Sequence, residues 1–300
     1  MTSNIAAPEN IGFVGIGNMG VPMAHLLVEA GYRLHIADKS AAAVQGFAAK
    51  HKCDIPPDLK SLGADCRVVI TMLPDGGIVR DVLLAENGVA DGLAPGSIVI
   101  DMSSSSAVGT RKLHHDLAQR AIHLIDAPVS GGVKKAVEGS LAVMAGGDES
   151  IVDCCRPLLE IMGRVFYTGV PGSGHAMKAL NNYLSAASLA SASEAVMAGA
   201  RFGLDPVTMI EILNASSGRS NSTETKFPLF ILNRQFNSGF FIGLLAKDLR
   251  LALEIAQTTD SPAGLLQTCA GLWEKAEMEL GFQADHTEYI KFLETLVEEK

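Results

Sequence analysis

The chain has 300 residues, about twice the usual length of a single domain, which favours an organisation in two domains. Apolar residues make up 48% of it and charged residues 19%, so the chain can bury a large core and is not intrinsically disordered. A net charge of −9 and an aromatic share of 5% argue against a nucleic-acid partner, because that binding uses clustered cations and stacking aromatic side chains.

The first half of the sequence alternates short apolar, β-branched runs with stretches of helical spacing. Strands are expected at 11–14, 34–37, 68–72, 98–101 and 122–126, and helices between them at 19–30, 41–50, 78–84 and 108–120. Two further apolar runs, 141–145 and 165–167, flank a helical stretch at 150–162 and extend the sheet. Such alternation predicts the α/β fold class, with a doubly wound parallel sheet covered by helices on both faces.

The second half begins at a turn-rich joint, 169–174, and carries no strand-like alternation. A long stretch rich in Ala, Ser and Leu runs from 175 to 202, and helical patterns follow at 206–213, 244–258 and 263–280, with loop residues at 216–242. We therefore expect an α/β domain over 1–170 and an all-α domain over 171–300, the latter for substrate and oligomer contacts. A long interdomain helix joins the two.

Features that direct a chain to a membrane or out of the cell are not expected here. The first ten residues have neither the cationic nor the apolar region of a signal peptide, and no run of about 18 apolar residues marks a membrane span. Five scattered cysteines without a CxxC spacing indicate reduced thiols and a cytoplasmic protein. The eight histidines include no HExxH pair, and we expect no metal.

A glycine-rich turn follows the first expected strand and opens the first expected helix. It is a G-x-G-x-x-G formed by Gly15, Ile16, Gly17, Asn18, Met19 and Gly20. The glycines permit a tight turn and a close approach of the backbone to a pyrophosphate, which then sits at the helix N-terminus. The pattern predicts a Rossmann-type dinucleotide-binding domain.

Asp38 ends the second expected strand and bears on the choice of cofactor. It lies 18 residues after Gly20, near the spacing of about 20 at which a carboxylate holds the ribose hydroxyls. Such a carboxylate repels a 2′-phosphate, which favours NAD over NADP. Lys39 leaves NADP as a possible cofactor, because a neighbouring cation neutralises that phosphate. The alternative interpretation of Lys39 is a solvated surface lysine without a role in cofactor binding.

Four motifs resemble those of one enzyme family in order and spacing. They are IGFVGIGNMGVPMAHLL at 11–27, DAPVSGG at 126–132, GSGHAMKALNN at 172–182 and LLAKDLRLA at 244–252. The chain resembles the β-hydroxyacid dehydrogenase family over essentially its whole length, a family that includes 3-hydroxyisobutyrate dehydrogenase, tartronate semialdehyde reductase and L-threonate dehydrogenase. The resemblance implies hydride transfer between a small β-hydroxyacid and its aldehyde or keto acid.

Lys178 and Asn182 are the candidate catalytic residues. They are four residues apart on an expected helix and so share a face. A buried ammonium beside a nicotinamide polarises a carbonyl and delivers a proton as hydride arrives, and neutral lysine takes the hydroxyl proton in the reverse direction. The resemblance gives Lys178 this acid/base role and makes Asn182 its positioning partner. A structural lysine that reaches the surface is the alternative.

The segment Ser130-Gly131-Gly132 is the candidate substrate-carboxylate site. Its backbone N–H groups and hydroxyl suit an anion, although a plain turn has the same sequence, and the resemblance assigns it to the carboxylate. The resemblance also places Met72, Leu73, Pro74, Ser104 and Lys247 against the cofactor. Arg219 and Phe240 are the remaining candidates for substrate contacts, with an exposed loop arginine as the alternative for Arg219. Lys247 is expected at the start of a helix, where a surface charge pair with Asp248 is the alternative.

The function predicted from the sequence is that of an NAD-dependent oxidoreductase, with NADP possible. An imine reductase and a non-catalytic nucleotide-binding scaffold are the alternatives, and Lys178 and the lack of a basic tail argue against them. The small side chains of the long helix need other helices around them. The family resemblance implies that part of the second domain is buried against a second subunit. We therefore expect a homodimer or homotetramer, with most of the interface from the all-α half and the substrate in the cleft between the halves.

Overall fold

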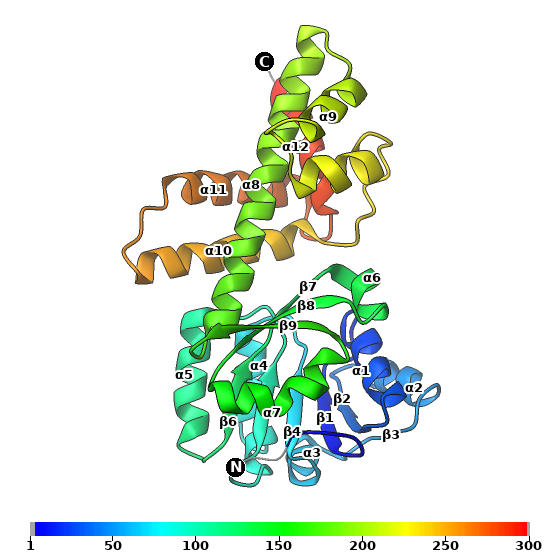
Figure 1. The fold of residues 1–300 in the computed structure, drawn as a ribbon, viewed down its shortest axis with the longest axis vertical. Coiled ribbons are helices and arrows are strands. Elements are labelled where there is room, and N and C mark those ends of the chain that lie inside the picture. Colours follow the sequence, from blue (N-terminus) through cyan, green and yellow to red (C-terminus); the bar gives the residue numbers. More distant parts are fainter. Residues whose placement is uncertain (1–3, 299–300) are drawn as a thin grey trace. The chain divides into compact units, whose positions relative to one another are not determined.

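The computed structural model describes residues 4–298 and divides into two compact units, Met1–Lys178 and Ala179–Lys300, here called the N-terminal and C-terminal units (Figure 1). The sequence places the boundary at 170/171, in the glycine-rich joint. The observed division falls eight residues later, inside a helix that begins at Ser173. Within the described residues, no helix is both long enough and apolar enough to cross a membrane.

One nine-stranded sheet forms the middle of the N-terminal unit, in the order β3-β2-β1-β4-β5-β6-β8-β7, with β9 paired to β8. Its strands are β1 (Asn10–Val14), β2 (Arg33–Ala37), β3 (Cys53–Asp54), β4 (Val68–Thr71), β5 (Ile98–Asp101), β6 (His123–Asp126), β7 (Val129–Ser130), β8 (Leu141–Gly146) and β9 (Gly163–Gly169). The pairs from β3 to β6 are parallel. The Rossmann-type sheet is confirmed.

The sheet is mostly parallel, as expected, and it departs from the parallel arrangement at β8, which runs antiparallel to both β6 and β7. The connections explain this, because a parallel pair needs a crossover of a dozen or more residues. Only residues 127–128 separate β6 from β7, and residues 131–140 separate β7 from β8. β9 then pairs parallel to β8 after a full helical crossover.

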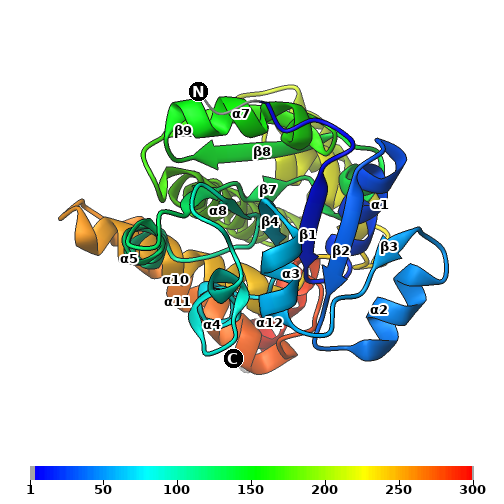
Figure 2. The same cartoon turned by 90° about the horizontal axis from the view of Figure 1, so that it is seen from below.

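Helices cover both faces of the sheet, as expected (Figure 2). They are α1 (Gly20–Glu29), α2 (Ala41–Ala48), α3 (Leu59–Asp65), α4 (Gly76–Leu84), α5 (Ala107–Ala118), α6 (Gly132–Val137) and α7 (Glu149–Glu160), with a 3₁₀ turn at Val89–Asp91. Successive strand residues point to opposite faces. Ile98 and Ile100 join the core that includes α1 and α7, whereas Val99 joins the core that includes α3, α4 and α5.

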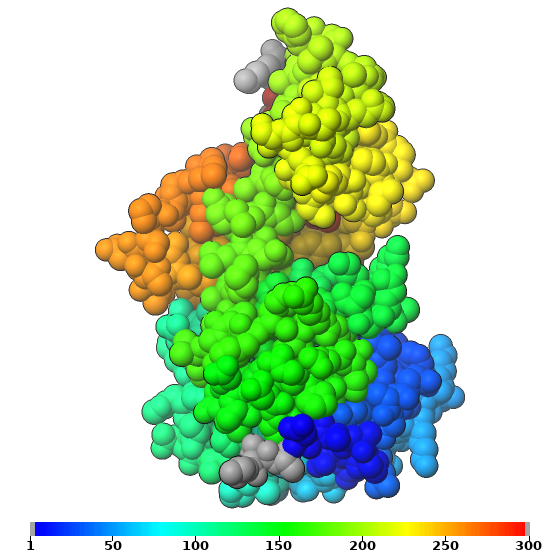
Figure 3. Space-filling view, viewed as in Figure 1, coloured from blue at the N-terminus to red at the C-terminus, as the bar shows by residue number. Residues whose placement is uncertain are grey.

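The C-terminal unit is helical, as expected, and among the described residues it adds only the isolated bridge between Phe241 and Asp285. Its helices are α8 (Ser173–Phe202, shared with the N-terminal unit), α9 (Pro206–Asn214), η2 (Ser222–Ile231), α10 (Ile242–Thr258), α11 (Gly264–Leu280), η3 (His286–Glu288) and α12 (Tyr289–Glu298). The loop expected at 216–242 is therefore wrong in part, because η2 is a ten-residue π-helix. It lies beside α9 (Figure 3).

Candidate active site

The three glycines of the turn after β1 have three different structural roles. Gly15 has a φ of +108°, and a Cβ there would lie 2.2 Å from the carbonyl oxygen of Met72 after β4. A Cβ on Gly20 would lie 1.9 Å from the carbonyl oxygen of Gly15, so the helix packs directly on the turn. Gly17 has nothing within 4 Å of its would-be Cβ. The open backbone at Gly17 is where an incoming group can approach.

The N-terminus of α1 is the part of this turn that suits an anion. Helices α2, α3, α4, α5 and α7 each begin with a serine or aspartate side chain that accepts a backbone N–H. Helix α1 has no such side-chain cap and no acidic residue in its first turn. Its first N–H groups and the positive end of its dipole therefore fit a pyrophosphate.

Asp38 follows β2 and is fixed against the glycine turn. Its carboxylate accepts the N–H of Ile16 at 2.7 Å and the N–H of Ser40 at 2.8 Å. A carboxylate offers about four lone-pair sites, so two ribose hydroxyls can still bind. Lys39 is exposed and Asp38 is half-buried, which leaves the carboxylate as the fixed charge at this position.

The segment Met72-Leu73-Pro74 leaves β4 next to the same turn. Met72 N–H donates to the carbonyl of Val14 on β1, and Leu73 N–H donates to the Oγ of Ser103, which follows β5. The half-buried Ser104 comes next in the chain. The structure thus brings together the glycine turn, Asp38, residues 72–74 and Ser104 at the carboxyl ends of neighbouring parallel strands, where open α/β sheets bind their ligands.

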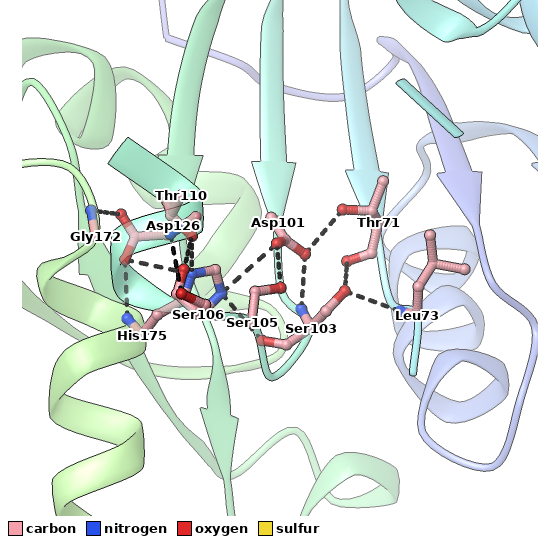
Figure 4. A network of polar contacts seen from close by, with 11 residues as sticks. Thr71, Leu73, Asp101, Ser103, Ser105, Ser106, Thr110, Asp126, Gly172 and His175 are labelled. Atoms are coloured by element: carbon pink, nitrogen blue, oxygen red, sulfur yellow. Dashed lines mark hydrogen bonds and ion pairs between the residues drawn. The ribbon is translucent and has the colours of Figure 1, made fainter. Parts of the chain in front are cut away.

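A buried polar network continues along this edge from β4 to the start of α8 (Figure 4). Asp101, at the end of β5, accepts hydrogen bonds from the hydroxyls of Thr71 and Ser105 at 3.0 and 2.8 Å. The ring of His175 lies 3.6 Å from Asp101 and 3.8 Å from Asp126. Its Nε2 faces the carbonyl of Ser103 at 3.1 Å, so Nε2 carries a hydrogen.

Asp126, at the end of β6, holds the first turn of α8. Its two oxygens accept the N–H of Gly172 at 2.7 Å and the N–H of His175 at 2.9 Å. Burial raises the pKa of this carboxyl, and the neighbouring His175 together with the two N–H donors opposes that rise. Asp126 thus takes the place of a helix cap, and it fixes the helix that carries Lys178 one turn later.

Asp126 and His175 have no role predicted from the sequence, although both lie within the motifs that resemble those of the family. Neither residue has a spacing that indicates a mutual contact. Each is almost completely buried, at 0% and 1% exposure. Their pairing depends on the packing of α8 against the sheet edge, which only the structure shows.

Lys178 and Asn182 lie one turn apart on α8, as predicted. Lys178 is half-buried rather than buried, and Asn182 is 6% exposed. Asn182 donates to an oxygen of Asp248 on α10 at 2.5 Å, and the other oxygen of Asp248 lies 3.8 Å from the Nζ of Lys247. Lys247 stands in the second turn of α10, which starts at Ile242, so the expectation that it opens a helix is wrong. The structure places Asn182, Asp248 and Lys247 together.

The remaining candidates occupy three separate places. Ser130 ends β7, and Gly131 and Gly132 have φ angles of +138° and +69°, a backbone that favours glycine. Arg219 is exposed and lies 3.6 Å from Glu224. The ring of Phe240 packs edge-on against His286, with 5.5 Å between centroids.

Comparisons with known proteins agree with this geometry. Residues 10–170 match the family model described as the NAD binding domain of 6-phosphogluconate dehydrogenase, and residues 172–293 match that of the NAD-binding domain of NADP-dependent 3-hydroxyisobutyrate dehydrogenase. The chain is 36% identical to the 2-(hydroxymethyl)glutarate dehydrogenase of Eubacterium barkeri, with 88% of each chain covered. It is 39% identical to the mitochondrial 3-hydroxyisobutyrate dehydrogenase of Drosophila melanogaster, with 86% of this chain and 81% of that one covered.

Among solved structures, the chain is similar to the 3-hydroxyisobutyrate dehydrogenase of Mycobacterium tuberculosis in complex with L-serine. The TM-score is 0.89 at 32% identity, covering 95% of this chain and 99% of the other. At this identity the likeness extends beyond the fold to the family.

Proposed function

Because the chain belongs to the β-hydroxyacid dehydrogenase family, we propose that it interconverts a small β-hydroxyacid and its aldehyde or keto acid with Lys178 as general acid/base. The family makes it an NAD(P)-dependent oxidoreductase. The observation that carries the role of Lys178 is its place on α8, one turn after the residues that Asp126 holds. A fixed backbone at this point limits the positions that the Lys178 ammonium can reach, which favours a productive orientation toward the substrate.

The residues fit a nicotinamide dinucleotide. The open backbone at Gly17 and the uncapped N-terminus of α1 hold the pyrophosphate, and Asp38 holds the ribose. We assign residues 72–74, Ser104 and Lys247 to the rest of the cofactor. The bound cofactor supplies or accepts the hydride. Asp38 favours NAD, and NADP remains a second cofactor because Lys39 stands next to it.

The protein's own contribution is the movement of one proton and the holding of the substrate. In reduction the Lys178 ammonium gives a proton to the oxygen that gains negative charge, and in oxidation the neutral amine takes the hydroxyl proton. Asn182 positions Lys178 and the substrate oxygen, and its amide is itself fixed by Asp248. Ser130, Gly131 and Gly132 bind the substrate carboxylate.

Two further parts of the proposal concern substrate range and setting. Arg219 and Phe240 contribute to substrate selection, and the substrate is a small hydroxyacid of the kind named for the relatives.

The five cysteines are free, which supports a cytoplasmic protein with reduced thiols. The protein acts as a homodimer or homotetramer, with most of the interface from the helical half, where Phe202 and Met278 are 88% and 79% exposed.

The proposed function is tested by following NADH at 340 nm while a panel of β-hydroxyacids and aldehyde acids is supplied. Lys178→Ala should lower kcat by about 10²- to 10⁴-fold while NADH still binds. Met177→Ala, which removes the neighbouring exposed side chain of α8, is the matched control and should keep full activity. A Lys178→Ala variant that retains more than about a tenth of wild-type kcat contradicts the acid/base role.

A further inference from the structure

Ser103, which follows β5, contacts two parts of the proposed active site that are far apart in the sequence (Figure 4). Its hydroxyl accepts the N–H of Leu73 at 2.9 Å, and its carbonyl oxygen lies 3.1 Å from the Nε2 of His175. Its own N–H donates to Asp101 at 3.0 Å, and it is 1% exposed. Ser104, assigned to the cofactor, follows it directly. Ser103 thus joins the cofactor-facing segments to the start of α8.

The imidazole of His175 spans the distance between Ser103 and α8. Because a carbonyl oxygen only accepts, Nε2 donates to Ser103. On the other side of the ring, Nδ1 lies 2.7 Å from the Oγ1 of Thr110 on α5. The backbone N–H of His175 is held by Asp126, and its side chain is 0% exposed. The ring therefore cannot turn without breaking a buried hydrogen bond.

Lys178 lies close to this ring along the helix. It comes three residues after His175, which is about 4.5 Å along the axis of α8. A chain of hydrogen bonds runs from Leu73 through Ser103 to His175, and these residues and Lys178 all belong to the N-terminal unit. One buried ring thus connects the cofactor-facing segment to the helical turn that presents the proposed acid/base.

We propose that His175 is a positioning residue, which sets the place of Lys178 relative to the cofactor through its hydrogen bond to Ser103. The inference rests on the proposed function, in which Lys178 moves a proton as the cofactor moves the hydride. Both transfers take place at one carbonyl group, and a misplacement of about 1 Å can cost about 10²-fold in rate. Because the ring is completely buried, it acts through Ser103 and α8 rather than on the substrate.

The two ring nitrogens allow a matched pair of variants. The amide nitrogen of glutamine can reach the place of Nε2, and that of asparagine the place of Nδ1. His175→Gln therefore keeps the bond to Ser103 and loses the contact with Thr110, whereas His175→Asn does the reverse. His175→Asn should lower kcat by about 10- to 100-fold with little change in the Kd for NADH. His175→Gln should keep kcat within about threefold.

Thr110→Val is the control, because it removes the contact at Nδ1 and leaves the ring in place. Each of the three variants breaks one buried hydrogen bond, so urea unfolding should show similar losses of stability. Only His175→Asn should lose activity. Equal losses of kcat in His175→Asn and His175→Gln, or a wild-type kcat in His175→Asn, overturn the inference and leave the proposed function standing.

Ser103→Ala gives the same test without changing the ring, and it decides the matter if His175→Asn does not fold. It breaks the chain of hydrogen bonds on the side of Leu73. Its kcat should fall by about tenfold, while that of Thr110→Val stays near the wild-type value. A Ser103→Ala variant with wild-type kcat overturns the inference.

Amide hydrogen exchange tests the connection without turnover. The Leu73 N–H should exchange about tenfold faster in His175→Asn than in the wild type, and no faster in His175→Gln. If its exchange is unchanged in both variants, Ser103 does not couple the two segments and the inference is wrong, whatever the activity shows. If it responds as expected and the wild type turns over no hydroxyacid, the connection stands and the proposed reaction is wrong.

Discussion

Replacing Gly17 and Gly20 by alanine in turn should separate cofactor binding from folding within one turn of chain. A Cβ at Gly17 meets nothing within 4 Å, and the residue has no left-handed φ. Gly17→Ala should therefore keep or raise stability, by about 0.4–1 kcal/mol, because alanine restricts the unfolded chain. The methyl group fills the space through which pyrophosphate oxygens reach backbone N–H groups. Losing one such charge-assisted bond, about 1.5–3 kcal/mol, raises the Kd for NADH roughly 10- to 100-fold.

Gly20→Ala should do the opposite. Its Cβ would lie 1.9 Å from the carbonyl oxygen of Gly15, so the backbone of α1 has to move. Overpacking of this kind costs about 1–3 kcal/mol of stability. Urea unfolding measures the stability of each variant, and NADH fluorescence titration measures the Kd. If Gly17→Ala binds NADH as tightly as the wild type, the cofactor does not cross this turn and the assignment of the dinucleotide site is wrong.

Three further predictions use other parts of the chain. Asp38→Ser should raise the ratio of kcat/KM for NADP to that for NAD by about tenfold or more, since it removes a charge that repels the 2′-phosphate; an unchanged ratio means that Lys39 already cancels Asp38. Lys226 lies on η2 and is 7% exposed. Lys226→Met should be more stable than the wild type at pH 7 by up to about 3 kcal/mol, the difference between a pKa of about 8 in the fold and 10.5 in the unfolded chain. That gain should shrink as the pH rises from 8 to 10.5, because only the unfolded wild type still holds the proton, and a constant gain in urea unfolding across this range contradicts the buried charge. Cys66 is 4% exposed and burial raises its pKa to about 12, so it should not react with a thiol reagent at about pH 8 until the protein unfolds; fast labelling of the native protein is the contrary outcome.

The parts of the fold that the sequence predicted are those with clear periodicity or strict backbone demands. The long strands and helices of both halves follow their apolar patterns. Gly15, Gly17 and Gly20 follow from the turn that they must form. The glycine turn after the first strand could therefore be predicted from its own residues, whereas residues 72–74 and Ser104 were assigned to the cofactor only through the family resemblance.

The parts that were missed have short or unusual patterns. Strands β3 and β7 are two residues long, too short to show alternation, and the antiparallel course of β8 depends on connection lengths. The π-helix η2 has neither helical nor strand spacing, and Pro228 within it argues against a helix. Contacts such as those of His175 with Asp126 and of Lys226 with Ser185 join residues more than 40 positions apart. Each requires knowledge of which elements pack together.

The continuous course of α8 has a consequence for how this chain can vary in length. Its first turn is held by Asp126, and the proposed roles of Lys178 and Asn182 depend on their angular positions around the helix. One inserted or deleted residue within 176–184 turns everything beyond it by about 100° and shifts it by about 1.5 Å. Side chains in this stretch other than those of Lys178 and Asn182 can be exchanged in mutant libraries, but the length of the stretch cannot change. Insertions should be tolerated better in exposed turns such as 259–262, because no candidate site residue follows such a turn on the same helix.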